Sequence, residues 1–101
     1  MVLYVLKWDI LPESREEYHG WITPAIERSL AVPGVVECRA YETVAGPHRK
    51  VVSYEFADLA AWQAWYAHEE VQRVLDELNA LTTNRTRDLW GPTGVALRPG
   101  A

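Results

Sequence analysis

Strand-like segments and helical segments follow one another along this chain in an order that few folds can accommodate. Strand character occurs in residues 2–9, 35–44, 49–57 and 82–90, and helical periodicity occurs in residues 14–31 and 59–81. The order is strand, helix, strand, strand, helix, strand, which is the split βαβ arrangement of ferredoxin-like α+β folds. We therefore expect one four-stranded antiparallel sheet that carries both helices on the same face.

The first strand is apolar on both of its faces. Residues 2–6 read VLYVL without alternation, a pattern typical of strands that are covered on both sides. Strand-like residues 35–44 and 49–57 also carry apolar side chains on both parities. Helices cover only one face of the expected sheet, and a large exposed apolar face marks an interface. The sequence therefore predicts a homodimer in which two sheets pack face to face about a two-fold axis, forming a dimeric α+β barrel.

Residues 59–81 contain an aromatic cluster followed by a regular amphipathic pattern. Asp58 can accept hydrogen bonds from the first free N–H groups of this segment, which predicts an N-cap. Trp62, Trp65 and Tyr66 share one face at helical spacing. The sequence allows a break near His68 as well as one continuous helix. The aromatic side chains either pack in the core or, beside such a break, leave room for a flat ligand.

The first helical segment, residues 14–31, carries signals at its start and in its interior. Ser14 and Glu17 have the spacing of a capping box. Pro24 removes one intrahelical hydrogen bond, which predicts a bend in the preceding turn. His19 lies beside the apolar stripe, where a solvated or capping role is expected.

Composition and charge limit the class of protein. We expect one domain, residues 1–91, in this chain of 101 residues, followed by a Gly- and Pro-rich tail, residues 92–101. A net charge of −4 without a basic cluster argues against nucleic acid as a partner, and no apolar run reaches the roughly 20 residues of a membrane span. A single cysteine, Cys38, excludes an internal disulfide and suggests a reducing, cytoplasmic location. The three histidines show no metal-ligand spacing.

Several motifs carry a resemblance to a known family. They are the first strand ending before Pro12, VPGV at residues 32–35, VVSYEF at 51–56, and LAAW at 59–62 leading to HEEVQ at 68–72. Over about residues 1–90 the chain resembles the dimeric α+β barrel superfamily, in particular its antibiotic biosynthesis monooxygenase-like family. That family includes cofactor-free oxygenases of polyketide-derived phenols and quinols. The resemblance therefore implies a monooxygenase-like homodimer that needs no cofactor and binds a small aromatic ligand.

In that interpretation a phenol or quinol binds between the sheet and the helices. Its chemistry needs a flat apolar slot, a base, and donors for the phenolate. His68 is the candidate base, because an imidazole changes its charge near neutral pH. The side chains expected to form the slot are Trp21, Trp62, Trp65 and Tyr66. The cations that would stabilise the anion, if their strand faces point inward, are Lys7, Arg39 or Arg85; otherwise they are solvated or form ion pairs.

Two other functions stay open. A non-catalytic ligand-binding or stress-response barrel would have its pocket filled by its own tryptophans. The haem-degrading branch of the superfamily uses an Asn on the first strand, a Trp on the second helix and a His about ten residues later. Here the first strand offers Leu6 or Lys7 in place of Asn, and the residues ten positions after Trp62 and Trp65 are not histidines. Haem degradation therefore ranks below the other two.

Overall fold

A computed structural model, which describes residues 1–46, 49–93, 95 and 99–100, contains the expected elements in the expected order. The strands are β1 (Val2–Ile10), β2 (Val35–Glu42), β3 (Lys50–Phe56) and β4 (Thr82–Trp90). The helices are the short 3₁₀ helix η1 (Pro12–Ser14), α1 (Arg15–Ala31), α2 (Leu59–Tyr66) and α3 (Glu69–Leu81). The strands form one antiparallel sheet in the order β2-β3-β1-β4. The predicted ferredoxin-like α+β fold is therefore confirmed.

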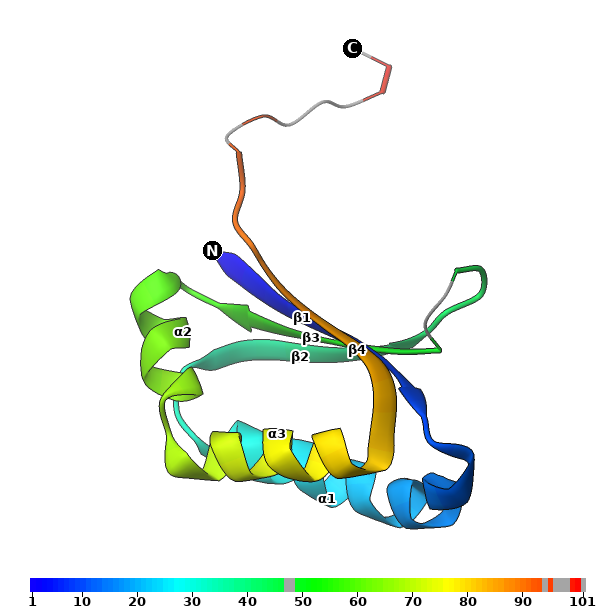
Figure 1. Cartoon of the computed structure of the whole chain (residues 1–101). Coiled ribbons are helices and arrows are strands. Elements are labelled where there is room, and N and C mark those ends of the chain that lie inside the picture. Colours follow the sequence, from blue (N-terminus) through cyan, green and yellow to red (C-terminus); the bar gives the residue numbers. More distant parts are fainter. Residues whose placement is uncertain (47–48, 94, 96–98, 101) are drawn as a thin grey trace.

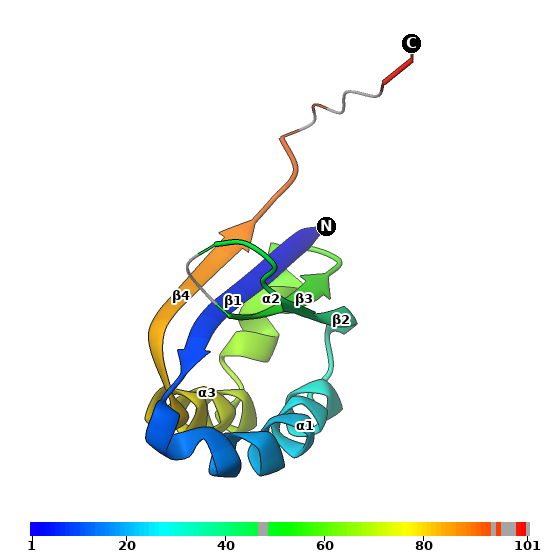
Figure 2. The same ribbon diagram turned by 90° about the vertical axis from the view of Figure 1, so that its right-hand side faces the viewer.

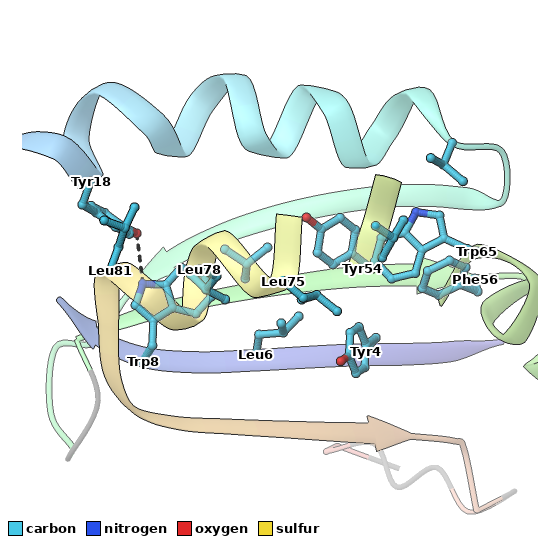
Figure 3. Close-up of a cluster of buried hydrophobic side chains, with 13 residues drawn as sticks. Tyr4, Leu6, Trp8, Tyr18, Tyr54, Phe56, Trp65, Leu75, Leu78 and Leu81 are labelled. Atoms are coloured by element: carbon cyan, nitrogen blue, oxygen red, sulfur yellow. Dashed lines mark hydrogen bonds between the residues drawn. The ribbon is translucent and has the colours of Figure 1, made fainter. Parts of the chain in front are cut away.

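The helices lie on one side of the sheet. Figures 1 and 2 show α1 and α3 packed side by side beneath the same face, with α2 at one end of the sheet. From β1, the side chains of Tyr4, Leu6 and Trp8 point toward the helices and enter the buried core (Figure 3). Phe56 and Trp65 lie at the other end of this core and are almost completely buried. The core thus fills the layer between sheet and helices.

A break separates α2 from α3, as the sequence allowed. Asp58 caps α2, and its Oδ1 accepts a hydrogen bond of 2.8 Å from the main-chain N–H of Ala61. The helix ends at Tyr66, and His68 becomes the N-cap of α3. Nδ1 of His68 accepts a hydrogen bond of 3.1 Å from the N–H of Glu70. The Asp58 cap is therefore confirmed, and of the two alternatives near His68 the structure has the break.

The start of α1 differs from the prediction. The side chain of Ser14 makes no capping hydrogen bond, so the capping box with Glu17 is wrong. The reason is the preceding turn of η1, in which the N–H of Ser14 donates to the carbonyl of Leu11 at 2.9 Å. This turn gives Ser14 a ψ of 5° instead of the extended backbone usual at an N-cap. Pro24 lies inside α1, which continues to Ala31.

Ion pairs tie α1 to α3. Arg28 Nε lies 2.5 Å from Oε1 of Glu70, and Arg28 Nη1 lies 2.7 Å from Oε1 of Glu77. Trp21 Nε1 also donates to Glu77 Oε1, at 2.7 Å. Hydrogen bonds from Arg28 lower the pKa values of both glutamates. The C-terminal half of α1 is therefore held to α3 by charged groups at the surface.

Irregular pairing explains why apolar residues occur at both odd and even positions of β2. The register against β3 shifts between Val35 and Glu37, which places Val36 in a bulge. Cys38 then faces the helices and Tyr41 the opposite side. β4 has a similar shift, where Asn84 adopts a φ of 52°, a conformation that asparagine tolerates. β2 and β3 are both shorter than the predicted 35–44 and 49–57. Residues 47–48 of the predicted turn lie outside the described residues.

The face of the sheet without helices carries a mixture of side chains. Val5 is only 3% exposed although no partner chain covers it, and Tyr41 and Trp90 are about half exposed. Lys7 lies over the ring of Trp90, with Nζ 5.9 Å from the ring centroid. The register places further charged residues on this face, namely Glu37, Arg39, Glu55 and Asp88. This surface is therefore less uniformly apolar than the sequence suggested. In the part of the chain that the structure describes, no helix is long and apolar enough to cross a membrane.

Candidate functional site

A small cavity lies between the sheet and helices α1 and α3. Its volume is about 30 Å³, which is room for one or two water molecules. Trp65 closes one side, and its Nε1 donates to the carbonyl of Ser29 at 2.9 Å. The hydroxyls of Ser29 and Tyr54 share a hydrogen bond of 2.9 Å, and the Tyr54 ring packs 4.9 Å from that of Trp65. The space beside Trp65 is therefore filled by the protein's own side chains.

A larger groove opens beside this cavity, between α1 and the strands β2 and β3. Its volume is about 310 Å³, at the lower end of the range for small-molecule sites. Trp8, Ile22, Ile26 and Val52 line both the groove and the inner cavity, so the two spaces adjoin. The other residues that line the groove are Tyr18, His19, Thr23, Ala40, Tyr41, Glu42, Lys50 and Val51. The groove thus has apolar walls and a polar end.

Tyr18 and His19 stand where the groove becomes polar. The hydroxyl of Tyr18 accepts a hydrogen bond of 3.0 Å from Trp8 Nε1 (Figure 3). Burial raises the pKa of Tyr18, which keeps its phenol protonated at neutral pH. Within the described ranges, the Tyr18 hydroxyl donates a hydrogen bond to no acceptor. The imidazole of His19 is exposed and lies edge-on to the Tyr18 ring, with centroids 5.7 Å apart. One neutral donor and one group able to accept a proton are therefore adjacent.

A second aromatic group lies between α2 and β1. The rings of Trp62 and Tyr66 stack with centroids 4.9 Å apart, and Tyr4 meets them at 5.6 and 5.8 Å. Burial raises the pKa of Tyr4 to about 12, although Arg87 acts in the opposite direction. Trp62 Nε1 is buried and has no hydrogen-bond partner in the described part of the chain. Of the four predicted slot residues, Trp21 and Trp65 line the inner cavity, whereas Trp62 and Tyr66 belong to this separate group.

The predicted base and cations lie away from the groove. His68 is exposed and its Nδ1 is engaged in capping α3. Lys7 and Arg39 lie on the face of the sheet without helices, where Arg39 pairs with Glu37. Arg85 donates to the carbonyls that end α3, including that of Asn79 at 3.1 Å. The structure therefore does not bring these four side chains together in one chain.

Tyr18 and His19 line the groove, although the sequence analysis did not select Tyr18 and expected only a solvated or capping role for His19. The sequence did contain one signal. Tyr18 and His19 lie about one turn into α1, four and five residues after Ser14, where the short helix η1 that follows β1 ends. A histidine so placed can face the end of the sheet. Sequence alone did not show that the end of β2 and the start of β3 lie opposite this turn and form the other wall of the groove.

No metal site accompanies the groove. Within the ranges that the structure describes, no group of three or more His, Cys, Asp or Glu side chains is arranged to hold a metal ion. The chemistry that the groove offers is therefore that of an aromatic-sized apolar slot with a phenol donor and an imidazole at one end.

The fold and the groove define a ferredoxin-like α+β protein with a ligand-sized hollow under one face of its sheet. The family model described as antibiotic biosynthesis monooxygenase matches residues 1–77. The chain therefore belongs to the antibiotic biosynthesis monooxygenase family. No curated protein sequence matches it.

Solved structures share the fold at low sequence identity. SnoaB, a cofactor-independent oxygenase from Streptomyces nogalater, is 16% identical with a TM-score of 0.74, over 93% of this chain and 94% of that one. A dabb family protein with a ferredoxin-like fold from Mesorhizobium loti is 19% identical with a TM-score of 0.79, over 92% and 97% of the two chains. Rv0793 from Mycobacterium tuberculosis is 15% identical with a TM-score of 0.75, over 95% and 98%. At these identities the comparison establishes the fold alone.

Proposed function

We propose that this protein is a cofactor-independent monooxygenase that acts on a small phenol or quinol bound in the groove between α1 and the sheet. The observation that supports this proposal is the groove itself, a hollow of about 310 Å³ whose apolar walls lead to Tyr18 and His19. Family membership and the likeness to SnoaB favour the same reaction class.

In the proposed reaction, His19 accepts the proton of the bound phenol. The protonated Tyr18 donates a hydrogen bond to the resulting oxyanion, which stabilises the electron-rich form that reacts with dioxygen. Dioxygen then delivers one oxygen atom to the ring as a carbonyl and leaves the other as water. The substrate supplies all four electrons, so 1-naphthol would give the 1,4-quinone with one dioxygen consumed.

Oxygen uptake with 1-naphthol and with anthrone tests the proposal. His19→Gln should lower kcat by roughly 100-fold, the usual contribution of a general base. His68→Gln is the matched comparison, because it makes the same chemical change at a histidine outside the groove. Loss of activity in His68→Gln alone would instead support the sequence-based prediction for His68. Uptake no faster than the uncatalysed rate with either compound contradicts an oxygenase function.

The alternative function is a non-catalytic ligand-binding or stress-response barrel. The small inner cavity favours it, because Trp65 and Tyr54 occupy the space beneath the sheet. Titration under anaerobic conditions separates the two functions. Binding of 1-naphthol without oxygen consumption after air is admitted identifies a binding protein.

We further propose that two copies pair through the face of the sheet without helices, in the cytoplasm. Half-exposed Tyr41 and Trp90 give this face its apolar surface. In this arrangement Lys7 and Arg39 would lie between the two sheets, where they could act only on a ligand held at the interface. Sedimentation should give twice the 11.5 kDa mass of one chain, and Leu3→Arg, beside Trp90 on this face, should give the single mass. A wild-type protein of single mass at micromolar concentration contradicts the dimer.

A further inference from the structure

The polar end of the groove continues into a second hollow with a different character. This hollow has a volume of about 330 Å³ and shares His19, Glu42 and Lys50 with the groove. Most of its lining residues carry charge, namely Asp9, Arg15, Glu42, Arg49 and Lys50; His19 and Ile10 complete the lining. The two hollows therefore form one continuous depression that is apolar at one end and charged at the other.

Both walls change character in the same direction. On α1, Arg15 and His19 lie one turn apart, and Ile22 and Ile26 continue the same stripe toward the C-terminus of the helix. On the sheet, the apolar pair Ala40 and Val52 lies opposite these isoleucines, and the next pair on that face is Glu42 and Lys50. A ligand lying along the depression would meet apolar side chains first and charges at its end.

The negative charges at this end are already engaged. Glu42 pairs with Lys50 at 3.2 Å. Asp9 accepts hydrogen bonds from Asn84 Nδ2 at 3.0 Å and from the main-chain N–H of Arg49 at 3.1 Å.

The charged side chains of this hollow leave a small positive excess. Neither Arg15 nor the side chain of Arg49 has an ion-pair partner in the described part of the chain. With Asp9 and Glu42 negative and Arg15, Arg49 and Lys50 positive, three cations against two carboxylates leave a formal charge of +1 at this end, on a protein whose net charge is −4.

From this arrangement we propose that the ligand of the groove is an acidic aromatic compound, whose anionic group lies between Arg15 and Arg49 while its ring lies against Ile22, Ile26 and Val52. Guanidinium groups bind carboxylates and phosphates through paired hydrogen bonds. The inference rests on the proposed aromatic groove and narrows its substrate class to phenols that carry a carboxylate or phosphate.

Calorimetric titration under anaerobic conditions with three matched probes tests the inference. The probes are 1-naphthol, 1-hydroxy-2-naphthoate and 1-naphthyl phosphate. The wild-type protein should bind one of the acids about tenfold more tightly than 1-naphthol, a difference of about 1.4 kcal/mol. The tighter acid identifies the anionic group as a carboxylate or as a phosphate. The preference should shrink as salt increases, because the arginines are exposed.

Variants localise the effect. In Arg15→Ala/Arg49→Ala the preference for the acid should fall to within about twofold, as expected for the loss of exposed charge pairs, while binding of 1-naphthol stays the same. Arg73→Ala removes an exposed arginine of α3 and is the control for Arg15→Ala. Ile26→Trp should weaken the binding of all three probes, because the larger side chain would fill the apolar end of the groove.

The outcomes separate the two proposals. Equal affinity for all three probes, or a preference that persists in the double variant, overturns the acidic ligand and leaves the aromatic groove intact. Acid binding that Ile26→Trp does not weaken places the ligand elsewhere and also overturns the inference. Absence of binding by any probe contradicts the proposed groove itself, and the acidic ligand with it.

Discussion

Trp65 and Trp62 allow a direct measurement of what one buried hydrogen bond contributes to this fold. Both lie on α2, three residues apart, and both indole N–H groups are buried. Trp65 Nε1 donates to the carbonyl of Ser29 at 2.9 Å, whereas Trp62 Nε1 has no partner among the described residues. Substitution by Phe removes the N–H at either position but leaves an acceptor unpaired only at Trp65.

The magnitude follows from the packing of each ring. Trp65 is 1% exposed, and the smaller ring would leave about 40 Å³ unfilled, which costs about 1 kcal/mol at about 24 cal/mol per Å³. The unpaired carbonyl of Ser29 adds about 1–3 kcal/mol. Trp65→Phe should therefore lower the free energy of unfolding by about 2–4 kcal/mol. Trp62→Phe should cost about 1 kcal/mol or less, because its ring is partly exposed and the substitution removes an unpaired donor.

Urea denaturation at one fixed protein concentration measures the difference. With an m value of about 1.5 kcal/mol/M, the midpoint should fall by about 1.3–2.7 M in Trp65→Phe and by less than about 0.7 M in Trp62→Phe. A fixed concentration is required because dimer formation would couple stability to mass action. Equal midpoints for the two variants, or a larger fall in Trp62→Phe, would refute the role assigned to the Ser29 carbonyl.

Three further substitutions test the frame around the groove. Asp58→Ala should lower the free energy of unfolding by about 1 kcal/mol through loss of the α2 cap, with Asp58→Asn nearly unchanged; similar losses in both variants would contradict the cap. Gly34→Ala should cost at least about 1 kcal/mol, because Gly34 has a φ of +126° and an added Cβ would lie 3.4 Å from the carbonyl of Ala61; an unchanged melting temperature would contradict it. Arg28→Met should destabilise the protein at neutral pH but not in acid. The pKa values of Glu70 and Glu77 are lowered in the folded state, so the stabilisation by Arg28 is present above the ordinary glutamate range and is lost as the pH falls through the lowered values. Denaturation midpoints of wild type and variant should therefore converge in acid, and a difference that persists there would contradict the ion pairs.

Local signals in the sequence were sufficient for the order of the elements. Asp58 marks the start of α2 because a carboxylate before an apolar helical stripe has one obvious role, to accept from free N–H groups. The fourth strand was predicted as residues 82–90, the bounds of β4, because three β-branched threonines follow the end of α3 and Leu89 and Trp90 complete the segment. These features depend on neighbours along the chain, which a sequence displays directly.

Features that depend on partners across the sheet were not predictable in the same way. The bulge at Val36 and the shift at Asn84 change which face a side chain occupies, and no local pattern fixes them. The faces of Lys7 and Arg39 followed from pairing with β3, which the sequence left open. A choice of site residues on strands therefore required the register.

The choice between histidines shows the same limit. His68 was selected by its side-chain type beside an aromatic cluster. The break in the helix, one of the two alternatives that the sequence left open, turns its Nδ1 toward the N–H of Glu70. His19 gained its place in the groove from the ends of β2 and β3, which are distant in sequence.

One wall of the groove is the stretch of α1 that lacks a backbone hydrogen bond because of Pro24. Pro24 has no N–H to offer the carbonyl of Gly20, and a side chain at Gly20 would meet no atom within 4 Å. One turn after Pro24, toward the C-terminus of the helix, Arg28 fixes α1 to α3 through its ion pairs with Glu70 and Glu77. On the other side of Pro24, Trp21 also holds the helix to α3 through its hydrogen bond to Glu77. A ligand in the proposed groove would therefore lie against a helix that lacks one backbone hydrogen bond but is fixed to α3 on both sides of that gap.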